Sequence, residues 1–272
     1  MEEKLFKKYI ILWLSQSVSG LGSSMTGFAL VLWAYGQSQS AMSVSLMSFC
    51  NYVPYVLFSL FVGDFIDRHR KKTIMLVSDS VAAIGSLAVF AFLVTGHLSV
   101  WNIYIVNTIV GVTNAFQQPA SAVATGWLVP KEKISNVSGM NSFSNNLIVV
   151  FSPMLAAFLF AIGGLSLVLL IDLASFVFAF CVLLFFIAIP EQVQQRTASS
   201  PFAGIAEGFS FLKKEKGILY IMLTMALINF FSRLTYENIL SPMILARSSG
   251  NNIALGIVNA CMGVGGIAGG II

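Results

Sequence analysis

Long apolar blocks alternate with short polar breaks along the whole chain. A helix needs roughly 20 mostly apolar residues to cross a bilayer, and these blocks reach that length. A transmembrane barrel would instead show short segments of alternating polarity, and only helices satisfy their own backbone groups in lipid. The pattern therefore predicts an all-α membrane protein with seven clear spans and an eighth at the end, at approximately 9–35, 42–65, 73–95, 101–126, 136–162, 165–189, 217–244 and 253–272.

Composition supports lipid as the solvent. Hydrophobic residues make up 57% of the 272 residues and charged residues 10%, whereas a soluble domain carries about 25% charged residues. The first block is too long for a signal-peptide core and lacks a small-residue cleavage site, so we interpret it as an uncleaved span. All three cysteines (Cys50, Cys181 and Cys261) lie within predicted spans, which favours buried packing thiols over disulfides.

The basic residues occupy alternate breaks between the blocks. The intervening breaks, "YGQSQSAM", "TGHLSVW" and "AIGGLS", contain no lysine or arginine. The positive-inside rule then places the N-terminus and the basic segments in the cytoplasm. We interpret these segments as topology anchors and expect no nucleic-acid binding, although the net charge is +4. The basic residues concerned are Lys4, Lys7, Lys8, Arg68, Arg70, Lys71, Lys72, Lys131, Lys133, Arg196, Lys213, Lys214 and Lys216.

The chain divides into three predicted parts: a bundle at 1–189, a polar cytoplasmic linker at 190–216, and the start of a second bundle at 217–272. Apolar residues at helical spacing within the linker predict a helix at the membrane surface. The second bundle repeats a helix, polar turn, helix pattern of the first, as expected of a transporter built from repeated halves. Because the chain ends in the apolar "GGIAGGII", we expect a fragment or a truncated gene product.

Polar residues are concentrated in the first, fourth and seventh blocks. Polar groups that face lipid are costly, so these helices should face protein or a water-filled cavity. For any single residue the alternative is a hydrogen bond that joins two helices, but the pattern over three spans favours a cavity. The candidates for binding substrate or protons are Gln16, Ser19, Asn107, Asn114, Gln117, Arg233 and Glu237.

Four charged residues lie in the interior of predicted spans, away from their ends. Arg233 and Glu237 are four residues apart on one helical face and so can pair; either they line the cavity, with Glu237 binding proton or substrate, or they only compensate each other. Asp79 and Asp172 are the single acids of two otherwise apolar spans. Asp79 is close enough to the nearby basic loop to bond its arginines, and Asp172 has either a structural or a coupling role.

The loop "GDFIDRHRKK" resembles the loop signature of the major facilitator superfamily. The stretches "SGLGSSMTGFAL", "NAFQQPASAVATGWLVPKEKISNVSGMNS" and "IDLASF" are similar to its macrolide-efflux and enterobactin-exporter branch. Arg70 departs from the signature, where the family commonly has glycine. The matching positions are Gly63, Asp67, Arg68, Lys71 and Lys72.

This resemblance implies a major facilitator fold, with an N-terminal six-helix bundle plus the first two helices of the C-terminal bundle. It also implies export of lipophilic or amphipathic small molecules by alternating access, coupled to protons, in a bacterial inner membrane. In such a protein the loop motif, together with Asp79, acts as a latch in one state. We expect a monomer that needs no cofactor.

Two family patterns are altered in this chain. The antiporter motif of the fifth span, normally rich in glycine, is "SPMLAA" here. Small residues still permit close helix packing. The arginine common on the fourth span is replaced by Val110, which weakens the case for proton coupling through that position. The packing motif consists of Ser152, Pro153, Ala156 and Ala157.

Other functions remain open from the sequence. A carrier of siderophores or other metabolites has the same fold, and a membrane sensor or scaffold has a similar composition. An enzyme is not expected, because the only histidines, His69 and His97, both lie in loops and form no metal cluster or catalytic triad. The chain contains no Gly-Lys-Ser/Thr phosphate loop, so ATP-driven pumping is not supported.

Overall fold

The computed structural model describes residues 2–189 and 210–233, together with Met243, Arg247, Val258, Cys261 and Gly265. Every element within these residues is helical, which confirms the predicted all-α class. The elements are α1 (Glu2–Ser38), α2 (Ala41–Arg68), α3 (Lys71–Val94), α4 (Val100–Leu128), the 3₁₀ turn η1 (Lys131–Lys133), α5 (Ile134–Cys181), the π-helical turn η2 (Val182–Phe186) and α7 (Lys216–Arg233).

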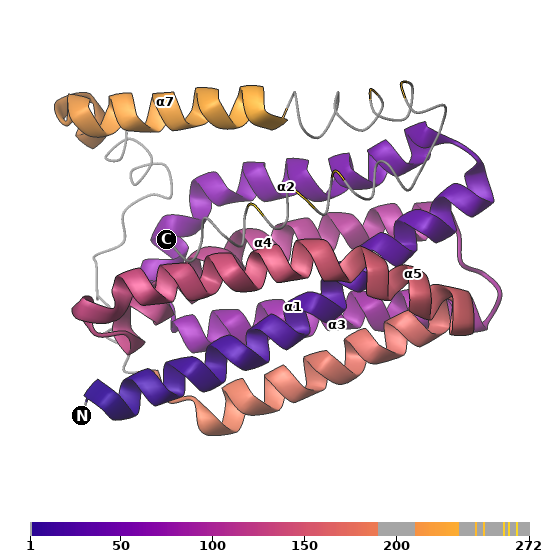
Figure 1. Ribbon diagram of the computed structural model, residues 1–272, viewed down its shortest axis with the longest axis horizontal. Helices are drawn as coiled ribbons and strands as arrows, with labels where there is room; N and C mark the ends of the chain where they lie inside the picture. The colour runs from indigo at the N-terminus through magenta and orange to yellow at the C-terminus, as the bar shows by residue number, and fades with distance from the viewer. Residues whose placement is uncertain are drawn as a thin grey trace. The chain divides into compact units, whose positions relative to one another are not determined.

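The fifth and sixth predicted spans are the two halves of α5, which reverses direction at Gly164 (Figure 1). Gly164 has φ 63° and ψ −165°, a conformation that residues with a side chain rarely adopt. A Cβ on the preceding Gly163 would lie 2.7 Å from the Leu167 side chain. The two glycines therefore permit the reversal that the break "AIGGLS" predicted.

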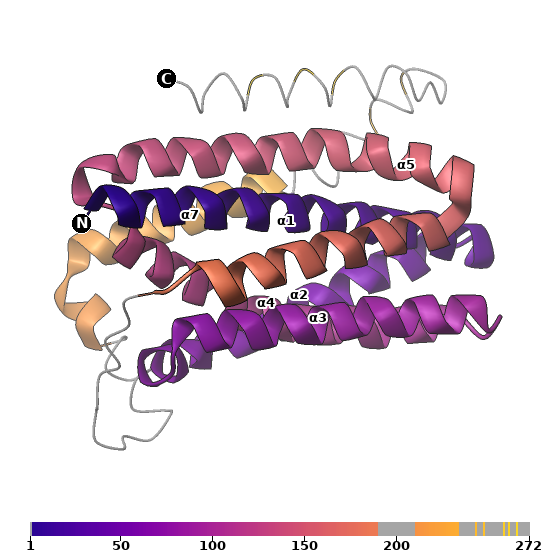
Figure 2. The same ribbon diagram turned by 90° about the horizontal axis from the view of Figure 1, so that it is seen from below.

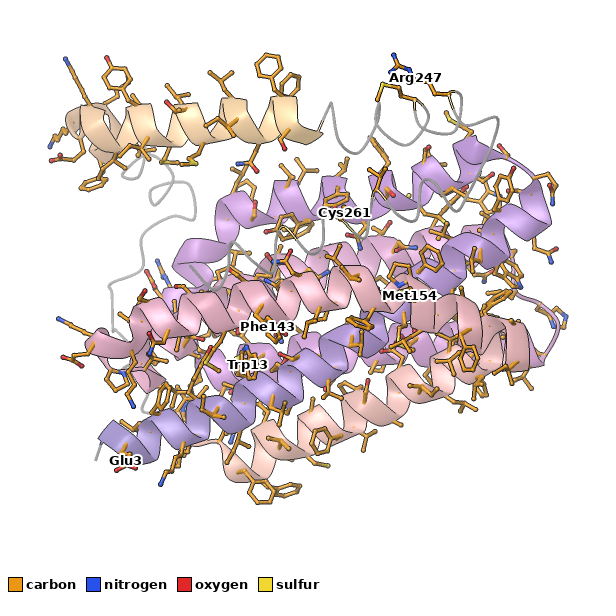
Figure 3. All side chains as sticks on the ribbon, viewed as in Figure 1. Glu3, Trp13, Phe143, Met154, Arg247 and Cys261 are labelled. Carbon is orange, nitrogen blue, oxygen red and sulfur yellow. The ribbon has the colours of Figure 1, made fainter. Side chains whose placement is uncertain are left out.

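Length and composition qualify four helices within the described residues as membrane-spanning: Leu5–Ser38, Met42–Gly63, Lys71–Val94 and Lys131–Phe186. The last has 56 residues and, with its reversal, suffices for two crossings of about 20 residues each. Helix α4 is 29 residues long, but its asparagine, glutamine and threonine residues lower its hydropathy. Exposed apolar side chains such as Met154, labelled in Figure 3, cover the outside of these helices. These properties are those of a helical membrane protein.

Helices α1–α5 pack around two apolar clusters. Helix α1 lies between the two halves of α5 (Figures 1 and 2), and α4 packs against α2 and α3. One cluster lies at the end of the bundle that carries the basic loops, here called the basic end, and includes Tyr9, Leu12, Ile66, Met75, Leu128, Leu183 and Ile187. The other lies toward the opposite end and includes Met25, Ala29, Val89, Ile103, Ala156, Val168 and Leu169.

The contacts divide the chain, apart from its last two residues, into two compact units, Met1–Thr197 and Ala198–Gly270. This division falls within the segment that we predicted as a linker. Helix α7 belongs to the second unit. The cytoplasmic position of 190–216 stays a prediction, and most of its expected amphipathic helix lies outside the described residues.

Candidate functional site

A small polar cavity lies inside the first unit, between α1, α3, α4 and the second half of α5. Its volume is about 120 Å³, well below the roughly 300–1,000 Å³ of a site for a drug-sized ligand. It therefore has room for water and an ion but not for a large substrate. The lining includes Ser19, Ser23, Thr26, Asp79, Ser86, Asn107, Val110 and Asp172, with no lysine, arginine or histidine among the described residues that line it.

Asp79 on α3 is held by amide groups from two other helices. The Nε2 of Gln117 on α4 donates to its Oδ1 at 2.8 Å, and the Nε2 of Gln16 on α1 donates to its Oδ2 at 3.5 Å. Both glutamines belong to the predicted cavity set. The arginines of the loop motif were the predicted partners of Asp79, but these hydrogen bonds instead place Asp79 with the cavity residues.

Asp172, in the second half of α5, is held by hydroxyl groups. Ser23 on α1 donates to Oδ1 and Ser86 on α3 donates to Oδ2, both at 3.1 Å. The residue is only 4% exposed. One carboxyl group thus joins three helices that are far apart in the sequence.

Close approach of α1 to Asp172 depends on Gly22. A Cβ at this position would collide with the Ser175 hydroxyl and would lie 3.2 Å from the Asp172 Cα. Since the backbone of α5 cannot move away as a flexible side chain could, glycine is required here for Ser23 to reach the carboxyl group.

Paired hydroxyls join α1 to the first half of α5. Ser144 donates to Ser17 at 2.7 Å, and the hydroxyls of Ser24 and Ser152 are also 2.7 Å apart. Small residues and hydrogen bonds of this kind are typical of helix contacts in membranes. Of the predicted packing motif, Ser152 and Ala156 are buried, Pro153 is partly buried and Ala157 is exposed.

Helices α2 and α4 cross closely at Gly111. A Cβ on Gly111 would collide with the carbonyl group of Asn51, and it would lie 3.2 Å from the Asn51 Cα. The Asn51 Nδ2 donates to the carbonyl oxygen of Asn107 at 3.3 Å. The predicted cavity residue Asn107 therefore lies next to a tight helix crossing.

The loop motif lies at the basic end of the bundle, where Gly63 and Asp67 are exposed. Lys71 is 2% exposed, with its Nζ 5.0 Å from the centre of the Trp127 ring. The Nζ of Lys72 donates to the carbonyl oxygens of Leu184 at 2.9 Å and Ile187 at 2.7 Å. Carbonyl groups at a helix end lack partners within the helix, so Lys72 caps the end of η2.

For most of the remaining predicted site residues, the structure gives a position or a degree of burial but no hydrogen-bond partner discussed above. Ser19 lines the cavity, and Asn114 is partly buried on α4. Arg68 is partly buried at the basic end. Arg233 is the last residue of α7, but its side chain and the whole of Glu237 lie outside the described residues, so the proposed pair stays a prediction.

The sequence did not place Ser23, Ser86 and Asp172 among the site residues. The third and sixth spans are apolar apart from one acid each, yet each turns one polar side toward the cavity. The sequence feature that could have identified these residues is the helical spacing of the polar positions. Asp79 and Ser86 are seven residues apart and therefore share a face of α3, and Ser19, Ser23 and Thr26 share a face of α1.

Comparison with known proteins agrees with this architecture. The model of the Major Facilitator Superfamily matches residues 12–272, and this chain therefore belongs to that superfamily. Macrolide efflux protein A of Streptococcus pyogenes is 30% identical over 82% of this chain and 55% of its own length. Macrolide efflux protein A of Enterococcus faecalis is 32% identical over 70% of this chain and 59% of its own length.

A third relative is the uncharacterized MFS-type transporter YfiS of Bacillus subtilis, 28% identical over 85% of this chain and 56% of its own length. The chain spans somewhat more than half the length of the curated relatives it matches. These names describe efflux proteins and a transporter, and none of them describes an enzyme.

Proposed function

We propose that this chain belongs to a secondary active exporter of lipophilic or amphipathic small molecules that works by alternating access. The similarity to macrolide efflux proteins over most of the chain supports export. The structural observation that carries the proposal is Asp79, a carboxyl group within a membrane-spanning helix that is hydrogen-bonded to two neighbouring helices. Ionisable residues inside membranes are costly and commonly mark transport pathways.

The hydrogen bonds of Asp79 support a proposed role for this residue in proton coupling. An ionised carboxylate only accepts hydrogen bonds, whereas a protonated carboxyl group also has a hydrogen to donate. The amide nitrogens of Gln16 and Gln117 are donors only, so uptake of a proton would force at least one of them to turn. Because the two glutamines belong to α1 and α4, the proton would change contacts among three helices. Arg233 and Glu237 are further candidates in the second unit.

The loop motif is proposed to act as a latch between conformations. Gly63 has nothing within 4 Å of the position that a Cβ would take, which leaves room for another helix in one of the states. Lys71 and Lys72 are bound within the bundle. Gly63, Asp67 and Arg68 are therefore the part of the motif proposed to engage and release a partner.

Membrane orientation forms part of the same proposal. Lysine and arginine at the basic end support a cytoplasmic position for that end and for the N-terminus under the positive-inside rule. The membrane is proposed to be the bacterial cell membrane. The protein is proposed to act as a monomer, which is supported by the position of all the residues that line the cavity within one unit of the chain.

The test is accumulation of a labelled macrolide in cells that express the full-length gene, with vector-only cells as the reference. We expect lower accumulation, restored to the reference level by a protonophore. Export that survives collapse of the proton gradient would contradict proton coupling. Transport of a single metabolite without macrolide export would favour a metabolite carrier, and an absence of any transport would favour a sensor or scaffold.

A further inference from the structure

The two carboxyl groups of the cavity have chemically different partners. Asp79 accepts hydrogen bonds from amide NH₂ groups, and Asp172 accepts them from serine hydroxyls. An amide NH₂ group offers only hydrogens, but a hydroxyl oxygen keeps its lone pairs after it donates. The hydroxyls around Asp172 therefore still have oxygen lone pairs for a positively charged ligand, whereas the amide nitrogens beside Asp79 have none.

Thr26 adds an independent observation at the same place. Its side chain is 6% exposed and lines the cavity close to the Asp172 carboxyl group. Its Oγ1 does not reach hydrogen-bond geometry with any group in the described part of the chain. Its hydroxyl faces the Asp172 carboxyl group, and its oxygen lone pairs remain available to a further ligand in the cavity.

Charge at this end of the cavity is not balanced by the protein. Asp172 is 4% exposed, and no lysine, arginine or histidine is among the described residues that line the cavity. A buried charge without a partner is strongly unfavourable. The partial positive charge of the two amide groups lies at Asp79, so a carboxylate at Asp172 would need a proton or a bound cation to neutralise it.

We propose that the Asp172 end of the cavity binds a monovalent cation of the size of sodium. Carboxylate and hydroxyl oxygens are hard ligands of the kind that alkali and alkaline-earth ions prefer. A single carboxylate neutralises one positive charge, whereas protein sites for Ca²⁺ take 6–8 oxygen ligands, commonly with several carboxylates. The ligands are the Asp172 carboxylate and the hydroxyls of Ser23, Thr26 and Ser86.

This ion would bind three helices together, because Ser23 and Thr26 belong to α1, Ser86 to α3 and Asp172 to α5. Sodium should therefore stabilise the folded protein, by an amount that grows with the logarithm of its concentration once that concentration exceeds the Kd. The inference concerns binding alone and does not depend on the transport proposal. It can hold for an exporter driven by protons and equally for a sensor.

The experiment measures thermal unfolding of the purified full-length protein in detergent at fixed pH. Sodium chloride replaces choline chloride at constant ionic strength, with potassium chloride as a parallel series. We expect the Tm to rise with the logarithm of the sodium concentration and to respond less to potassium. Equilibrium binding of ²²Na⁺ provides a second measurement that does not depend on unfolding.

Two variants locate the site. Asp172→Asn should abolish the sodium response. Thr26→Val is nearly isosteric and removes one of the three hydroxyl groups beside Asp172, so it should fold and should weaken sodium binding about tenfold, equivalent to about 1.4 kcal/mol. The exposed acid Glu132→Gln is the matched control and should bind sodium like the unmodified protein.

Three outcomes would overturn the proposal. The first is an unmodified protein that neither binds ²²Na⁺ nor gains stability from sodium. The second is sodium binding that Thr26→Val and Asp172→Asn both leave unchanged. The third is stability that follows pH alone with no competition from sodium, because Asp172 would then bind only a proton.

Discussion

Gln117 donates its side-chain amide to Asp79 at 2.8 Å, and this contact joins α4 to α3 within the membrane-spanning bundle. The Oε1 of Gln117 is buried with no hydrogen-bond partner among the described residues. The glutamine is thus held through its NH₂ group alone, and its orientation depends on the aspartate. Both residues are therefore expected to act as one unit in stability and in transport.

Removing this contact should destabilise the bundle. In Gln117→Leu, the Asp79 carboxyl group keeps only the longer hydrogen bond from Gln16. We expect a loss of about 1–3 kcal/mol in the free energy of unfolding, as for other buried hydrogen bonds to charged groups. Denaturation in detergent measures it. A double-mutant cycle with Asp79→Asn should be non-additive; fully additive effects would show that the contact contributes nothing.

Replacing the carboxyl group itself should impair transport. Asp79→Asn keeps the size of the side chain but cannot take up and release a proton. We expect the protonophore-sensitive part of macrolide export to fall on the order of tenfold, as for an ionisable residue on a transport pathway. The exposed Glu132→Gln should export normally. Undiminished export by Asp79→Asn, at matched expression, would remove Asp79 from the proposed mechanism.

The crossing of α2 and α4 should not tolerate a methyl group at Gly111. The added carbon would collide with the backbone of Asn51, so the two helices must separate. We expect Gly111→Ala to cost about 1–3 kcal/mol, as for other overpacked positions. Gly126→Ala on the same helix is the control, because nothing lies within 4 Å of its Cβ position. Equal stability of the two variants would contradict this close crossing.

The hydroxyl pair of Ser24 and Ser152 should contribute modestly to the contact of α1 with α5. Measured hydrogen bonds between membrane helices average about 0.6 kcal/mol. We expect a coupling of that order from the cycle Ser24→Ala, Ser152→Ala and the double variant, measured by unfolding in detergent. The exposed Ser138→Ala provides the reference. A coupling of zero would mean that only the small size of these residues is needed.

Lys72 should stabilise the end of η2. Lys72→Met keeps the length of the side chain but loses the donor to two carbonyl groups, at an expected cost of about 1 kcal/mol. Hydrogen exchange should become faster around 184–189. Lys131→Met removes the same charge from an exposed position at the same end. In this control variant, hydrogen exchange around 184–189 should stay as in the unmodified protein. Unaltered exchange in Lys72→Met would show that the cap is dispensable.

The sequence was sufficient for the properties that depend on pattern along the chain. Hydropathy and the basic loops predicted the helices, the reversal at Gly164 and the clustering of Lys71 and Lys72 at one end. The polar character of α1 and α4 predicted that Gln16 and Gln117 face the interior. These properties depend on the helical period and on whether each side chain prefers lipid or a polar environment. Both can be recognised from residues that are close together in the sequence.

The hydrogen-bond partners of the two buried carboxyl groups could not be predicted from the sequence in the same way. Asp79 meets two glutamines because of how α1, α3 and α4 pack against one another, and the pattern along a single helix does not determine this packing. Ser86 and Asp172 gave only weak signals, since a single polar residue in an apolar span indicates equally a hydrogen bond between helices or a ligand site.

The tight reversal at Gly163 and Gly164 has a mechanical consequence. The two arms of α5 are tethered by a hinge too short to let one arm slide away from the other. One arm carries Ser152 and the other carries Asp172, so we expect a shift that begins where Ser152 touches α1 to reach the carboxyl group through the tether. Lengthening that tether with a few flexible residues would separate the two movements.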